Sequence, residues 1–106
     1  MAMIEKGRDM LTLINVFKVA PENQQKLVDL LVEATDQTIR FLPGFISANI
    51  HKSYDGRRVV NYAQWRSRED FEAMLENQEA RPHMKRAAEM AEFDPVLCEV
   101  VHVDQA

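Results

Sequence analysis

Hydrophobic and polar residues alternate first between residues 11 and 19, where the sequence reads LTLINVFKV. Alternation among β-branched and aromatic residues predicts a strand, which Ala20-Pro21 would end. From residue 22 to about residue 41 the apolar positions instead recur at helical spacing, and Pro43-Gly44 follows directly. The positions that share this spacing are Leu27, Leu30, Leu31, Ala34, Thr38 and Phe41. A helix that ends before the Pro-Gly pair is therefore predicted.

The second half of the chain predicts three more strands and two shorter helices. Residues 45–53 and 57–66 read as strands joined by a hairpin, because Asp55-Gly56 supplies the positive φ that a tight turn needs. Ser67 predicts the N-cap of one helix, and Pro82 the first position of another that runs to about residue 91. Residues 96–103 predict the last strand. The resulting order, β-α-β-β-α-(α)-β, is that of a ferredoxin-like α+β fold with a four-stranded antiparallel sheet.

Two of the predicted strands are apolar on both faces. In the first strand Leu13 and Phe17 share one face, while Ile14 and Val16 share the other. The helices can cover only one face of such a sheet, so the other face needs a second cover. We therefore expect a homodimer that packs sheet against sheet about a two-fold axis. Tyr62 and Gln64, which alternate with Asn61, are expected at that interface.

Composition and charge exclude several classes of partner. The 106 residues suffice for one domain, with a core from about residue 11 to residue 103. Cys98 is the single cysteine, so no internal disulfide can form. The net charge of −4 argues against nucleic-acid and anionic-membrane partners. The N-terminus lacks the apolar run of a secretory signal and no stretch is long enough to span a membrane, so we expect a cytoplasmic protein.

Candidate chemistry enters in residues 59–67, which read VVNYAQWRS. In a strand, Asn61 and Trp65 share a face with Val59 and Ala63, and these two small apolar residues mark that face as buried. Buried amides and indoles need hydrogen-bond partners, which either the protein or a bound molecule supplies. Asn61 and Trp65 are thus candidate ligand contacts. An internally satisfied amide and a core anchor are the alternative interpretations.

Several motifs taken together resemble the antibiotic biosynthesis monooxygenase family: INVFKV before a helix, LPGFISANIH, the DG hairpin, VVNYAQWRSREDFEAM and RPHMK. The most specific are Pro43-Gly44-Phe45 and the W-x-S-x-E-D-F pattern of residues 65–71. The resemblance spans nearly all of residues 11–103 and implies a dimeric α+β barrel. It leaves the reaction open, because the family includes cofactor-free oxygenases, haem-degrading enzymes and members that act in isomerisation.

The first interpretation is a cofactor-independent monooxygenase that oxidises a flat phenolic, anthrone or quinol-type molecule with O2, as in aromatic polyketide or secondary metabolism. Such a substrate, once deprotonated, gives electrons to O2 itself, so we expect no flavin, haem or metal. The resemblance implies Asn61 and Trp65 as catalytic residues that position the substrate. It also implies His51 as the proton carrier.

The chain departs from the polyketide oxygenases at two places on the later helices. Phe71 stands where those enzymes carry a tyrosine, so a tyrosine-mediated proton step is in doubt. The basic residue that the resemblance implies on the last helix matches either Lys85 or Arg86. Methionines suit a pliable wall against a flat ligand. The expected substrate contacts are Asn15, Phe17, Phe71, Met74, Met84, Lys85 and Arg86.

Two alternatives stay open. The haem-degrading branch of the superfamily uses an asparagine on the first strand, a tryptophan at the end of the third and an axial histidine on a helix. Asn15, Trp65 and His83 lie at roughly those positions, and His83 would be the only metal ligand. The other alternative is a dimeric accessory protein that binds a small molecule without turnover. The absent tyrosine favours binding alone, whereas the donors of Asn61 and Trp65, with His51 expected near them, favour an enzyme.

Overall fold

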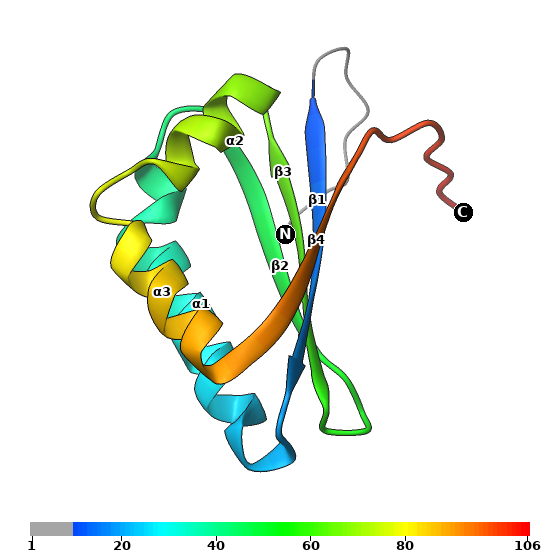
Figure 1. The fold of residues 1–106 in the computed structure, drawn as a ribbon. Coiled ribbons are helices and arrows are strands. Elements are labelled where there is room, and N and C mark those ends of the chain that lie inside the picture. The colour runs from blue at the N-terminus through cyan, green and yellow to red at the C-terminus, as the bar shows by residue number, and fades with distance from the viewer. Residues whose placement is uncertain (1–9) are drawn as a thin grey trace.

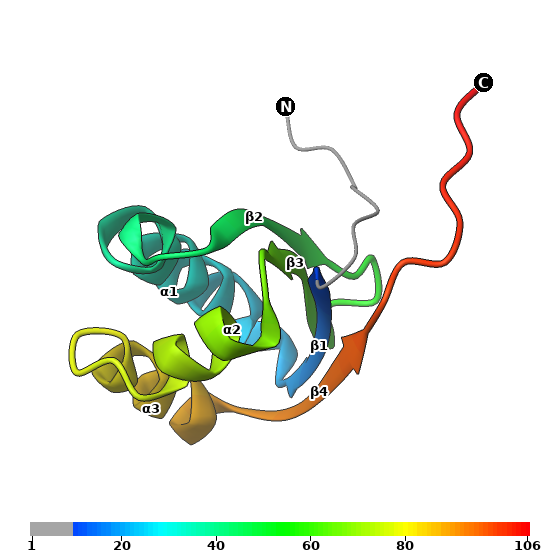
Figure 2. The ribbon, with the colours of Figure 1, turned by 90° about the horizontal axis from the view of Figure 1, so that it is seen from above.

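Four antiparallel strands form one sheet in the order β2-β3-β1-β4 in the computed structural model, which describes residues 10–106. Three helices all lie over one face of this sheet (Figures 1 and 2). The predicted ferredoxin-like fold is confirmed. The strands are β1 (Leu11–Val19), β2 (Phe45–Lys52), β3 (Arg58–Trp65) and β4 (Ala91–Cys98), and the helices are α1 (Gln24–Gln37), α2 (Arg68–Leu75) and α3 (Arg81–Met90).

The first helix is shorter than the apolar spacing predicts. Turns of 3-10 helix, Pro21–Asn23 and Ile39–Phe41, flank α1 at its two ends. Thr38 lies between α1 and the second turn with φ of −133°, outside the helical range, and so ends α1.

The starts of the later helices agree with the caps that the sequence predicts. The Ser67 hydroxyl oxygen accepts a hydrogen bond from the backbone N–H of Asp70 at 3.1 Å, which caps α2. The third helix begins at Arg81, one residue before Pro82. Proline is tolerated there because the first helical N–H groups have no partner within the helix.

The predicted position of the last strand, residues 96–103, is wrong. β4 begins directly after α3 and ends at Cys98, while residues 99–106 have no regular secondary structure and extend away from the sheet (Figures 1 and 2). Pro95 lies inside β4, and a proline usually argues against a strand, so the sequence pattern did not predict the first part of β4. β4 is an edge strand and has a neighbouring strand on one side only. A proline is tolerated in such a strand when its missing N–H would point to the side without a neighbour.

Strand register decides which side chains share the face that the helices cover, called here the helix-side face. Each row of this face joins one residue of β1 to one of β3. The rows are Leu11 with Trp65, Leu13 with Ala63, Asn15 with Asn61, and Phe17 with Val59. Three of the four rows are apolar, and the Asn15–Asn61 row is polar.

The polar row separates two buried hydrophobic clusters. The first cluster consists of Leu11, Leu13, Ala63, Trp65, Phe71, Met74 and Ala80. The second cluster consists of Phe17, Val19, Leu27, Leu30, Val59 and Ala87. A domain usually has one contiguous core. Here the core divides at Asn15 and Asn61, and α3 bridges the division, since Met84 packs on the first cluster and Met90 on the second.

Candidate functional site

Asn15 and Asn61 lie directly opposite each other on the two central strands. Residues so paired have Cβ atoms about 4.5–5.5 Å apart, so the two amides are neighbours. The Oδ1 atom of each is buried without a hydrogen-bond partner, and no other described residue has such a side-chain atom. An unpartnered buried polar group costs about 1–3 kcal/mol. Two of them side by side therefore favour a binding role over a structural one.

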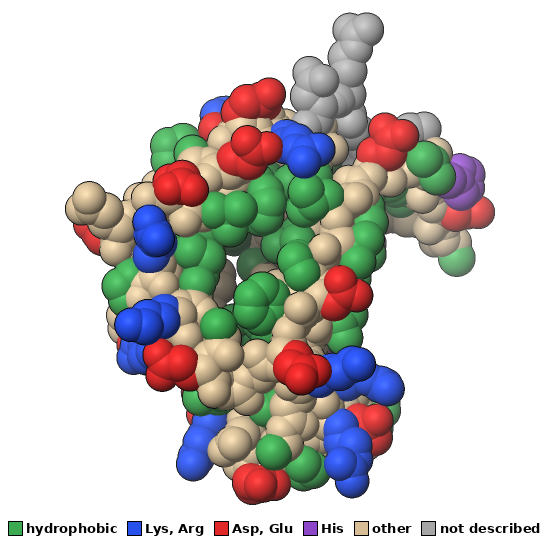
Figure 3. Space-filling view, in the orientation of Figure 1, with side chains coloured by type: hydrophobic (Ala, Val, Ile, Leu, Met, Phe, Trp, Pro, Cys, Tyr) green, Lys and Arg blue, Asp and Glu red, His purple; other side chains and the backbone are tan. Residues whose placement is uncertain are grey.

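The strand neighbours of this pair are apolar. Ile50 flanks Asn61 on β2, and Pro95 flanks Asn15 on β4. Figure 3 shows the molecule hollowed between the helices and the sheet, with hydrophobic side chains around the opening. Both asparagines are only half-buried although their Oδ1 atoms are buried, so their exposed surface belongs to their other atoms.

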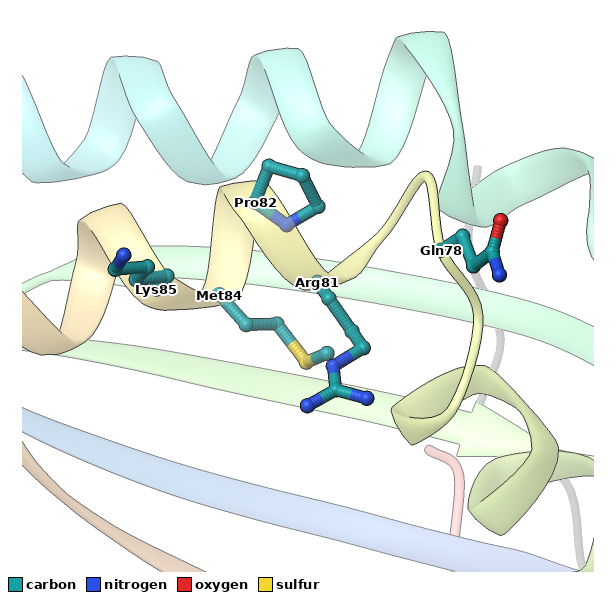
Figure 4. A pocket seen from close by; sticks show the side chains of 5 residues that line it. All are labelled: Gln78, Arg81, Pro82, Met84 and Lys85. Carbon is teal, nitrogen blue, oxygen red and sulfur yellow. The ribbon is translucent and has the colours of Figure 1, made fainter.

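A cavity of about 780 Å³ that is largely open to solvent lies beside the first half of α3. Figure 4 shows its lining, in which Arg81 and Met84 point from α3 toward the strands. Met84 also packs against the first cluster and so connects the cavity with the core around Trp65. The lining residues are Gln78, Arg81, Pro82, Met84 and Lys85.

Trp65 lies almost wholly inside the first cluster, with 1% of its surface exposed. The Phe45 and Phe71 rings meet it edge-on, with centroids 5.6 Å and 6.4 Å from the indole. Phe71 therefore packs the indole where the polyketide oxygenases are expected to carry a hydroxyl. This packing fixes the orientation of Trp65 and agrees with a core anchor. Its role as a ligand donor stays a prediction.

The expectation that His51 lies near Asn61 and Trp65 is wrong within one chain. Ile50 is the residue opposite Asn61, and His51 pairs with Val60 on the other face of the sheet. Successive side chains of a strand point to opposite faces, so the sheet separates His51 from both site residues. The histidine is exposed, and its Nδ1 lies 3.0 Å from the carbonyl oxygen of Asn49.

Among the expected substrate contacts, the structure distinguishes core residues from cavity residues. Phe17 is buried in the second cluster, and Met74 in the first. Lys85 lines the cavity, but Arg86 does not. The guanidinium of Arg86 donates to Nδ1 of His83 at 3.0 Å instead. Of the two basic residues that the sequence left open, Lys85 is thus the one at the cavity.

The haem alternative stays a prediction, and the position of His83 does not favour it. This residue is absent from the cavity lining, and its Nδ1 accepts the hydrogen bond from Arg86. Among residues 10–106, no group of three or more His, Cys, Asp or Glu side chains could hold a metal ion.

Sequence reasoning missed Gln78, Arg81 and Pro82 as cavity residues. The spacing of Arg81 and Lys85 was an available signal, because residues four apart lie on the same side of a helix. Which side of α3 faces the cavity depends on how the helix packs. Within the part of the chain that the structure describes, no helix has the length and apolar content to cross a membrane.

The four-stranded sheet with helices on one face defines an α+β domain, and the divided core and the adjoining cavity give it a candidate ligand site. The sequence model of the antibiotic biosynthesis monooxygenase family matches residues 10–90. Tetracenomycin-F1 monooxygenase of Streptomyces glaucescens is 49% identical over 102 residues, which cover 96% of this chain and 91% of that protein. The chain therefore belongs to the antibiotic biosynthesis monooxygenase family, and the predicted enzyme class, a monooxygenase, is confirmed.

Solved structures of similar fold agree with this assignment. A monooxygenase from the gene ActVA-Orf6 of Streptomyces coelicolor, in complex with nanaomycin D, is 27% identical with a TM-score of 0.83, and 91% of each chain is covered. A putative antibiotic biosynthesis monooxygenase of Nitrosomonas europaea is 20% identical, with a TM-score of 0.78 over 93% of this chain and 97% of that one. SnoaB, a cofactor-independent oxygenase of Streptomyces nogalater, is 20% identical, with a TM-score of 0.75 over 91% and 97%. The last two likenesses show a shared fold.

Proposed function

We propose that this protein is a cofactor-independent monooxygenase that oxidises an anthrone- or quinol-type ring of an aromatic polyketide. The observation that carries the proposal is the pair of buried, unpartnered amides, Asn15 and Asn61, in the middle of an apolar face. The 49% identity to tetracenomycin-F1 monooxygenase supports a polyketide substrate. SnoaB, a cofactor-independent oxygenase of the same fold, supports the expectation that no cofactor takes part.

The proposed reaction balances without an added electron donor. Loss of a proton from an anthrone CH2 group gives an enolate, and the enolate reduces and then binds O2 at that carbon as a peroxide. Protonation of the peroxide and loss of water leave a carbonyl group at the same carbon. The CH2 group loses four electrons in total, one oxygen atom enters the product and the other leaves as water.

Asn15 and Asn61 would hold the oxyanion of the enolate. An amide offers two N–H donors at Nδ2, and an anionic oxygen favours the orientation in which both amides donate. Donors already in place where charge develops are the largest contribution in many enzymes. The hydrophobic clusters on either side of the pair would exclude water, which strengthens these hydrogen bonds. Trp65 would orient the ring from one end.

Oxygen uptake tests the proposed function. The purified protein is given a small panel of anthrones and hydroquinones, and the autoxidation of each is subtracted. With the anthrones we expect saturable uptake of one O2 for each quinone formed, and labelled O2 should place one labelled atom in that product, whereas simple dehydrogenation of a hydroquinone would place none. Asn61→Ala should lower turnover at least about tenfold, because one oxyanion donor is worth roughly 2.7–4 kcal/mol in other enzymes. Binding of panel members without uptake would instead support the accessory-protein alternative.

We propose further that a second copy of the chain covers the face of the sheet opposite the helices, called here the outer face. Ile14, Val16 and Val60 lie there half-buried, and Val96 is 45% exposed beside them. Gln64, expected at this interface, is instead fully buried, and its amide donates to the Thr12 hydroxyl at 3.0 Å.

A further inference from the structure

The cover that the helices give to the sheet ends between β1 and β4. On the helix-side face Leu13 of β1 pairs with Leu97 of β4, and Phe17 pairs in the same way with Phe93. The two β1 residues are 6% and 5% exposed, whereas their β4 partners are 38% and 50% exposed. β4 leaves α3 at Ala91 and runs away from the helices (Figure 2). Within the described chain the apolar face of β4 is therefore open to solvent.

This open face is continuous with the amide pair. Asn15 pairs directly with Pro95, which lies between Phe93 and Leu97 on the helix-side face of β4. Neighbouring strands lie about 4.8 Å apart, so a single strand spacing separates Pro95 from Asn15. The Nδ2 atoms of Asn15 and Asn61 form no hydrogen bond within the described chain and are not buried, so they can donate to a bound molecule. One surface thus leads from the two amides to the edge of the sheet.

Phe93, Pro95 and Leu97 give this surface the form of a slot, called here the β4 slot. Phe93 and Leu97 lie about 13 Å apart along the strand at roughly 3.3 Å per residue, and the shorter Pro95 lies between them as a floor. The Phe93 ring packs on Phe17 with centroids 6.0 Å apart, which fixes its orientation. Figure 3 looks onto the β4 edge and shows hydrophobic side chains around an opening between the helices and the sheet. A flat aromatic ring fits above Pro95.

We infer that the substrate enters across the β4 edge, and that Phe93 and Leu97 are specificity-determining residues that bind its third fused ring over Pro95. The inference rests on the proposed function, and it specifies the substrate as a linear polycycle of at least three rings. When the carbonyl oxygen lies at the amides, a bicyclic molecule ends over the central strands, whereas a third ring reaches β4. Burial of that ring removes apolar surface of the ligand and of β4 from water. The two residues contact the substrate and take no part in its oxidation.

Xanthone and chromone test this inference without turnover, because neither compound has the CH2 group that the reaction oxidises. Xanthone stands in for a three-ring anthrone, and chromone is the corresponding ketone with one ring fewer. Trp65 is the only tryptophan of the chain, so quenching of its fluorescence reports binding. We expect xanthone to bind about tenfold more tightly than chromone, because its third ring buries further apolar surface.

Truncation of the two slot walls should remove this preference. The double variant Phe93→Ala with Leu97→Ala should bind xanthone and chromone within about twofold of each other. Leu97→Ala alone leaves the Phe17–Phe93 contact intact and should reduce the preference to about threefold. Val96→Ala shortens an apolar side chain on the outer face of the same strand and should keep the full preference. Circular dichroism checks folding, and Leu97→Ala decides the test if the double variant does not fold.

The outcomes distinguish this inference from the proposed function. Equal affinity of the wild-type protein for both compounds, or no binding of either, would overturn the inference. A preference that survives unchanged in the slot variants would overturn it as well. Variants that weaken both compounds alike would indicate a structural role of β4 and would also overturn it. Preferential binding of xanthone without oxygen uptake on any anthrone would uphold the β4 slot and contradict the oxygenase.

Discussion

At the level of single residues, the two central amides suggest that stability and activity have opposite requirements. Replacing Asn61 by leucine, which branches at the same carbon, removes an unpartnered buried oxygen and adds apolar surface between the two clusters. We expect the free energy of unfolding to rise by about 1 kcal/mol. Oxygen uptake should fall at least about tenfold. Urea unfolding measures the stability, and an oxygen electrode measures the uptake. A variant that loses both stability and oxygen uptake would show that the amide is structural.

Gln64 provides the matched control on the same strand. It points to the outer face, and its hydrogen bond to Thr12 is buried. In Gln64→Met the Thr12 hydroxyl loses this donor, so stability should fall by about 1–2 kcal/mol. Oxygen uptake should remain within about twofold of the wild-type rate, because the sheet separates this residue from the amides. A large loss of uptake would mean that the outer face takes part in catalysis.

Sequence reasoning at this scale succeeded where a local rule applied. Alternation along β3 placed Asn61 on the helix-side face, because neighbouring side chains of a strand point in opposite directions. It failed for His51, because the register between β2 and β3 decides which residues of β2 share a face with Asn61. The direct pairing of Asn15 with Asn61 depends on register in the same way, and it became visible only in the folded sheet.

Among the elements, the junction of β2 with α2 depends on a glycine. Gly44 has φ of +82°, and a Cβ atom there would collide with the Asp70 carboxylate that belongs to the α2 cap. Gly44→Ala should therefore cost about 1–3 kcal/mol, measured as a shift of the urea midpoint. Gly56 has a similar φ of +79°, but a Cβ atom there would lie 3.8 Å from its nearest neighbour, in Pro21. Gly56→Ala should cost less than Gly44→Ala, and equal losses would contradict the role of the Asp70 contact.

The β2–β3 hairpin should respond to pH through Asp55. The Ser53 hydroxyl and the backbone N–H of Arg57 both donate to this carboxylate and lower its pKa below the ordinary value of 3.8. A lowered pKa contributes stability that is present above the unfolded pKa and is lost as the pH falls through the folded pKa. At neutral pH Asp55→Asn should unfold at a lower temperature than the wild type. The difference should vanish below the folded pKa, and a difference that persists in strong acid would exclude this cause.

For the whole molecule, the outer face predicts the oligomeric state. If a second copy covers Val16, light scattering should give twice the chain mass of 12.3 kDa. Val16→Lys places a charge in the centre of that face and should halve the mass, since a buried unpaired charge is costly. Val32→Lys changes an exposed valine of α1 and should leave the mass unchanged. Circular dichroism checks that both variants fold, and a wild-type protein of 12.3 kDa would contradict the sheet-to-sheet dimer.

The sequence by itself determined the number and kind of elements up to the last strand, the buried face of β3 and the family. Each of these depends on local rules: the 3.6-residue and two-residue periods, caps such as Ser67, and short motifs. The tertiary structure alone decided that β4 begins before Pro95, that Asn15 faces Asn61, that His51 lies on the other face, and that Arg81 and Lys85 share a cavity. These outcomes depend on strand register and helix packing, which long-range contacts establish and no local pattern encodes.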